Sequence, residues 1–112
     1  MTYLVGSLTE AAKLLEVPTL ITGSMASPYA VLSTDACVSV NPDADTTVTL
    51  PAAPPNGRIL DVVDRTGGAF THNITIDGNG NTINGAATLV LAQNRAAVRL
   101  QYVVVGTQWN IL

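Results

Sequence analysis

Alternating apolar and polar positions dominate the chain from residue 36 onward, in short stretches rich in valine, isoleucine and threonine. β-Branched residues at a period of two favour strands, and Gly, Pro and Asn between them favour turns. The pattern predicts strands at residues 36–40, 46–50, 58–64, 72–76, 82–83, 88–91, 97–105 and 107–112. Short strands at near-regular spacing indicate a mainly β fold: a small antiparallel β-sandwich, a barrel or a β-prism.

Two turns are well marked in this region. Residues 77–81 read Asp-Gly-Asn-Gly-Asn, and these residue types tolerate the positive φ that tight turns need. Gly106 separates two β-type stretches and predicts a final hairpin.

The N-terminal third has a different pattern. Residues 7–17 are typical of a short helix, because Ser7 and Glu10 fit a capping box and Pro18 blocks continuation. Its apolar positions form one face: Leu8, Ala11, Ala12 and Leu15. A helix of about three turns is marginal alone, so it packs either on its own β domain or on a neighbouring subunit.

Residues 19–35 are expected to be irregular or to form short extended pieces, with glycine, serine and proline interrupting any period. We therefore expect an N-terminal arm at residues 1–35, carrying the helix, and a β domain at residues 36–112.

Composition suggests association. Only 12% of the 112 residues are charged, about half the usual share for a soluble domain. A surface with so few charges is poorly protected from contact with other molecules. This favours a homo-oligomer or a bound protein partner. The net charge of −3 gives no basic surface for nucleic acid.

Neither a membrane span nor export is expected. No apolar run approaches the roughly 20 residues that cross a bilayer, and the first residues lack the pattern of a signal peptide. The single cysteine, Cys37, is expected to be a small buried residue.

Candidate chemistry is sparse. His72 is the only histidine, and no neighbouring pattern pairs it with Cys37 or a serine as a nucleophile and base. Asp77, Asn79 and Asn81 reproduce the start of a calcium loop, but Thr82 replaces the required glycine and Thr88 the bidentate glutamate. The sequence therefore predicts a non-enzymatic protein without cofactor or metal.

The region from Val48 to Leu112 resembles a module of tailed-bacteriophage virion proteins. Its marks are Val48-Thr49-Leu50-Pro51, Asn56-Gly57-Arg58 and Asp61-Val62-Val63-Asp64, then the run from Asn73 to Ala86 and the closing Gly106-Thr107-Gln108-Trp109-Asn110-Ile111. The resemblance implies a part of a capsid-decoration protein, head fibre or tail fibre, commonly assembled as a trimer.

The expectation is therefore a capsid decoration, cement or head-fibre-base protein, made in the host cytoplasm and placed on the capsid surface in preference to the tail. Its partners would be copies of itself, in a trimer, and the major capsid protein or another virion protein. The interface candidates are Leu4, Val5, Leu8, Leu15, Leu20, Val103, Val105, Trp109, Ile111 and Leu112.

The alternative is a tail-fibre or tail-tip component that binds a host glycan or another tail protein. It needs exposed aromatic residues that stack on sugar rings. The candidates are Tyr3, Tyr29, Tyr102 and Trp109.

Overall fold

The computed structural model describes residues 17–112. The predicted helix, apart from its last residue Val17, lies outside the described residues. So do four of the interface candidates: Leu4, Val5, Leu8 and Leu15.

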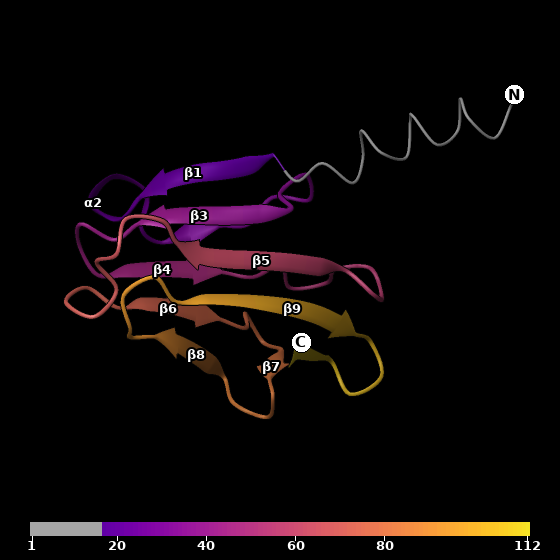
Figure 1. Ribbon diagram of the computed structural model, residues 1–112. Coiled ribbons are helices and arrows are strands. Elements are labelled where there is room, and N and C mark those ends of the chain that lie inside the picture. The colour runs from indigo at the N-terminus through magenta and orange to yellow at the C-terminus, as the bar shows by residue number, and fades with distance from the viewer. Residues whose placement is uncertain (1–16) are drawn as a thin grey trace, which may run out of the picture.

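Two sheets form the described part of the chain (Figure 1). One has six strands in the order β1-β3-β5-β9-β10-β7, and the other has four in the order β2-β4-β6-β8. The strands are β1 Pro18–Thr22, β2 Tyr29–Ala30, β3 Cys37–Asn41, β4 Thr46–Thr49, β5 Ile59–Asp64, β6 Ile74–Asp77, β7 Thr82–Ile83, β8 Thr88–Leu91, β9 Ala97–Val103 and β10 Gln108–Ile111. A single turn of helix, α2 (Gly23–Ala26), follows β1.

The first six strands wind as three stacked coils. Each coil gives one strand to the six-stranded sheet and the next strand to the other sheet, so β1, β3 and β5 lie parallel, as do β2, β4 and β6. The register pairs Pro18 with Cys37 and Cys37 with Asp61. The last strands then close the stack, since β9 pairs antiparallel with β5 and β8 pairs antiparallel with β6.

The prediction of a mainly β fold is confirmed, and the strands from β3 onward lie close to the predicted ranges. The expected antiparallel pairing is only partly right, because five of the eight strand pairs in residues 17–112 are parallel. Most consecutive strands belong to different sheets, so a strand's partner is often one coil away in sequence. The predicted hairpin at Gly106 is present between β9 and β10.

Residues 18–35, assigned from the sequence to the arm, belong to the sheets. They supply β1, which pairs with β3, and β2, which pairs with β4. The segment looked irregular because β2 has only two residues and Pro28 and glycine interrupt any period. The boundary predicted after residue 35 is therefore wrong, because the sheets begin at Pro18.

One hydrophobic core lies between the sheets. The six-stranded sheet contributes Val38, Val40, Leu60, Val62, Leu100, Tyr102 and Trp109, and the four-stranded sheet contributes Val48, Ile74, Ile76 and Leu91. The Trp109 and Tyr102 rings lie opposite each other on β10 and β9, with centroids 5.3 Å apart. Close packing of branched and aromatic side chains is the main source of stability in such a core.

Among residues 17–112, no helix has the length and apolar character needed to cross a bilayer.

We expect Leu100→Ala to lower the free energy of unfolding by about 2–5 kcal/mol, because it empties space at the centre of the core. Val105→Ala is the matched control: the Val105 side chain is 84% exposed, so its truncation should cost less than about 0.5 kcal/mol. Urea denaturation followed by circular dichroism measures both values. Equal effects of the two substitutions would contradict the assignment of the core.

Candidate functional site: the two ends of the sandwich

The strand directions gather the connections at two opposite ends of the molecule (Figure 1). The arm end is where β1 begins, and it comprises Val17 and the connections 31–36, 50–58 and 104–107. The loop end comprises α2 and the connections 42–45, 65–73 and 92–96. Because connections carry most binding groups in β proteins, these ends are the candidate functional surfaces.

Asp35 organises the arm end. Its buried carboxylate accepts hydrogen bonds from Thr19 Oγ1 at 2.6 Å, from the Tyr29 hydroxyl at 2.6 Å and from the Leu32 N–H at 2.8 Å. Burial opposes ionisation of Asp35, but these bonds outweigh it and lower its pKa. Burial, together with the bond to Asp35, raises the pKa of Tyr29 to about 12. The first coil is thereby closed by a carboxylate that stays charged.

Arg58 fastens the same connection to the third coil. Its guanidinium donates to the carbonyls of Ser33 at 2.9 Å and Leu32 at 3.2 Å, and also to the carbonyl of Asp35. Three carbonyls bound by one planar cation fix the path of residues 32–35. The arm end is therefore a rigid surface.

Exposed apolar side chains gather on this rigid end. Val17 is 79% exposed and immediately follows residues 1–16, while Val105 is 84% exposed at the tip of the β9–β10 turn. Hydrogen bonds link the β9–β10 turn to the connection 50–58, because the Val104 N–H donates to Asn56 Oδ1 and the Gly57 N–H donates to the Tyr102 carbonyl. We call the set the arm-end apolar cluster: Val17, Leu32, Ile59, Val104 and Val105.

Asp64 organises the loop end. Its buried carboxylate accepts bonds from the backbone N–H groups of Thr66, Gly67, Gly68, Ala69 and Arg95, at 2.8–3.3 Å. Burial favours the neutral acid, but the bonds from the backbone outweigh it and lower the pKa of Asp64. One carboxylate thus closes the connection after β5 and holds the connection between β8 and β9 against it.

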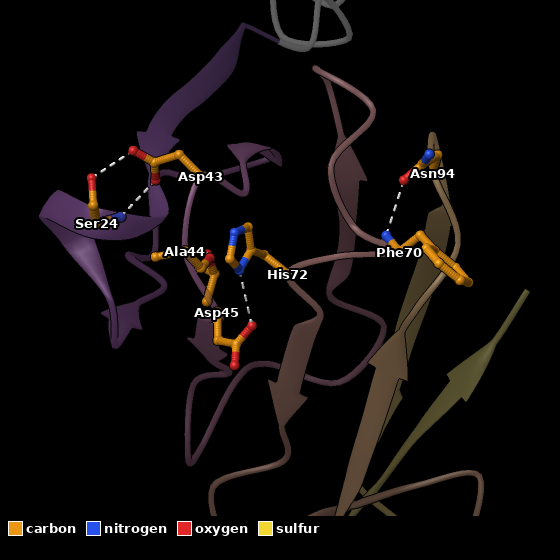
Figure 2. A network of polar contacts seen from close by, with 8 residues as sticks. Ser24, Asp43, Ala44, Asp45, Phe70, His72 and Asn94 are labelled. Atoms are coloured by element: carbon orange, nitrogen blue, oxygen red, sulfur yellow. Dashed lines mark hydrogen bonds and ion pairs between the residues drawn. The ribbon is translucent and has the colours of Figure 1, made fainter.

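Three further pairs of residues make polar contacts at the loop end, as Figure 2 shows. Ser24 donates to Asp43 through its hydroxyl at 2.6 Å and its N–H at 2.8 Å. His72 Nδ1 lies 3.5 Å from Asp45 Oδ1. The Phe70 N–H donates to Asn94 Oδ1 at 3.0 Å, which holds an aromatic side chain that is 73% exposed.

This cluster contains serine, histidine and aspartate, but not the order of contacts that activates a nucleophile. Such a relay needs the serine hydroxyl to face the imidazole, which in turn faces a carboxylate. Here Ser24 donates to Asp43, whereas His72 faces a different carboxylate, Asp45 (Figure 2). These contacts hold α2 and the connection after β5 to the connection 42–45.

The structure separates the predicted interface residues. Trp109 is fully buried, so its assignment to an interface was wrong: alternation along β10 directs it into the core, where it meets Tyr102. Val105 is prominent at the arm end, and Val103 beside it is half-buried. Leu20, Ile111 and Leu112 are exposed elsewhere on the surface.

In the described residues, the aromatic side chains considered for sugar stacking are buried or half-buried. Tyr102 is buried with Trp109, and Tyr29 is half-buried with its hydroxyl bound to Asp35. Tyr3 lies outside the described residues.

The polar side chains of the turn at residues 77–81 make hydrogen bonds to backbone groups. Asn79 and Asn81 donate to the carbonyls of Leu50 and Ala52, and Asp77 accepts from the Asn79 N–H. Residues 17–112 hold no group of three or more histidine, cysteine, aspartate or glutamate side chains placed to bind a metal. The turn therefore holds the connection 50–58 against the end of β6.

Sequence reasoning missed both organising carboxylates. Asp64 had a local signal, because an aspartate shortly before two glycines, as in Asp64-Arg65-Thr66-Gly67-Gly68, is typical of a turn that bonds its own backbone. Asp35 had none, since Thr19 and Tyr29 reach it only after the first coil has closed.

Comparison with known proteins adds no assignment. No protein-family model matches the chain, and no curated protein matches it.

We expect Asp64→Asn to lower the free energy of unfolding at neutral pH by about 2–3 kcal/mol, since the amide nitrogen cannot accept the backbone bonds. Because folding lowers the pKa of Asp64, its contribution is present above the ordinary value of 3.8 and is lost as the pH falls through the folded value. The variant should therefore lose less stability than the wild type between about pH 5 and pH 2.

Asp45→Asn serves as the control, because the Asp45 side chain is 84% exposed and its contact with His72 lies at the surface. Chemical denaturation at a series of pH values measures all three proteins. An Asp64→Asn variant with the stability and acid profile of the Asp45→Asn control would refute the role of Asp64.

Proposed function

We propose that this protein is a structural component of a tailed-phage virion, a capsid decoration, cement or head-fibre-base protein that binds the shell through its arm and its arm end. The observation that carries the proposal is the arm-end apolar cluster, which adjoins the point where residues 1–16 join the sheets. Large apolar side chains exposed at one end of a molecule favour association with another protein there.

The rigidity of the arm end supports this role. Asp35 and Arg58 fix the connection that carries Leu32, and Asn56 fixes the one that carries Val104. Apolar side chains on a fixed backbone lose little entropy when they bind, so more of the burial energy appears as affinity. A protein partner that covers the cluster is the natural occupant.

The two ends differ in a way that suits one-sided attachment. The connections of the loop end are held by hydrogen bonds to Asp64, Asp43 and Asn94, and their exposed large apolar side chains are Met25 and Phe70. The arm end carries five such side chains. We therefore propose that the arm end faces the shell and the loop end faces away from it.

The sequence resemblance to virion modules supplies the identity of the shell, and the low charge favours assembly over a free monomer. A protein that binds only the assembled shell stabilises it in proportion to its binding free energy, summed over all copies. Many moderate contacts would thus raise the cost of disassembly.

We expect the double variant Val104→Asp/Val105→Asp to bind shells at least about tenfold more weakly than the wild type. Binding would no longer bury the side chains of two valines that are exposed in the free protein. The measurement is cosedimentation with phage particles stripped of this protein, over a range of protein concentrations. Light scattering of the free proteins gives the oligomer mass in parallel, and a trimer or a pair of trimers is expected for the wild type.

Met25→Asp/Phe70→Asp is the matched control, since it adds the same charge at exposed apolar positions of the loop end. It should bind shells like the wild type. A wild-type protein that ignores the shells would refute the proposal, and weaker binding by the loop-end variant alone would reverse the orientation.

A further inference from the structure

We infer that β8 is a pairing edge through which two copies of this chain join their four-stranded sheets about a two-fold axis. The inference uses only β8 and its neighbours, and it does not rest on the proposed virion role. In residues 17–112 the two sheets have four edge strands: β1, β7, β2 and β8.

Three of these edges are protected in the ways that β proteins commonly use. β1 begins at Pro18, which has no N–H to donate, and β2 is two residues long and follows Pro28. β7 is also two residues long, and Ile83 bonds to Ala86 on its far side. Proline, short length and a covering segment each prevent the addition of another strand.

β8 has none of these protections. Its residues, Thr88-Leu89-Val90-Leu91, include no proline and no charge. The Thr88 side chain is exposed, and that of Val90 is 46% exposed. An uncharged edge strand of β-branched and aliphatic residues is a ready template for another strand.

The ladder to β6 identifies the open backbone groups. Gly78 N–H donates to the Ala87 carbonyl at 3.0 Å, which makes this a hydrogen-bonded pair at the start of the ladder. Bonded and non-bonded pairs alternate in antiparallel strands, so Leu89 and Leu91 bond to β6. The N–H and C=O groups of Thr88 and Val90 therefore point away from β6, toward the open edge.

A second copy of β8 fits this edge in one register. With Leu89 on the two-fold axis, Thr88 of each copy faces Val90 of the other, and all four open groups of each strand find partners. The side-chain pairs across the junction are then threonine with valine, a favourable combination of β-branched residues. No like charges meet, which suits a chain whose net charge is −3.

The residues of this edge also allow clean tests. Val90 donates no hydrogen bond to β6, so Val90→Pro removes an outward donor and leaves the ladder intact. Val90→Lys instead places a charge at the junction, the usual guard of an edge strand. Leu20→Lys is the matched control, because Leu20 is an exposed residue on the edge strand of the other sheet.

The first experiment is light scattering of the full chain over a concentration series. We expect the wild type to reach twice the mass of the Val90→Pro and Val90→Lys proteins. This ratio holds whether the unit that pairs through β8 is a single chain or a trimer. Leu20→Lys should keep the wild-type mass. An equal mass for the wild type and both Val90 variants at all concentrations would overturn the inference.

The second experiment tests the register. Two-fold pairing places the Leu89 residues of the two copies opposite each other in a non-bonded pair, about 4.5 Å apart at Cα, which suits a disulfide. In a Cys37→Ser background, Leu89→Cys should form a disulfide-linked dimer under mild oxidation, and Leu20→Cys should not. Equal yields from the two cysteines would exclude this register.

Discussion

The carboxylate of Asp64 is the interaction on which the closure of this fold depends. The third coil must leave the six-stranded sheet after β5 and enter the other sheet at β6, and its backbone N–H groups turn inward as it does so. Asp64 accepts four of these bonds and a fifth from Arg95, at the connection between β8 and β9. A buried backbone donor without a partner is costly, so one side chain allows both the last coil and the strands that cover it to fold.

The same requirement divides the molecule into two unlike ends. At the loop end, carboxylate and amide side chains satisfy the connections from within, and two large apolar side chains are exposed. At the arm end, Asp35 and Arg58 satisfy the connections in the same way, yet five large apolar side chains are exposed there. Satisfied backbone beneath exposed apolar side chains is the arrangement of a preformed binding surface. This asymmetry is the physical basis of the proposed attachment through the arm end.

Local features of the sequence predicted the strands from β3 onward well, because alternation and turn residues act within a few positions, as in 46–49, 88–91 and the hairpin at Gly106. Strand partners were harder to predict, since a parallel coil brings together residues such as Pro18 and Cys37 that share no local signal. Trp109 was assigned to the wrong face because alternation alone does not say which side of β10 meets the core. Asp35 was missed because its partners come from two separate strands. The arm-end apolar cluster was likewise found only in part, through Val105.

Hydrogen exchange of the protein bound to virion particles, compared with the free protein, tests the central claim most directly. The claim is that the arm end meets the shell and the loop end does not. It predicts that binding slows exchange in residues 31–36 and 104–107 and leaves residues 65–73 unchanged. Slower exchange in residues 65–73, with no change at the arm end, would contradict it.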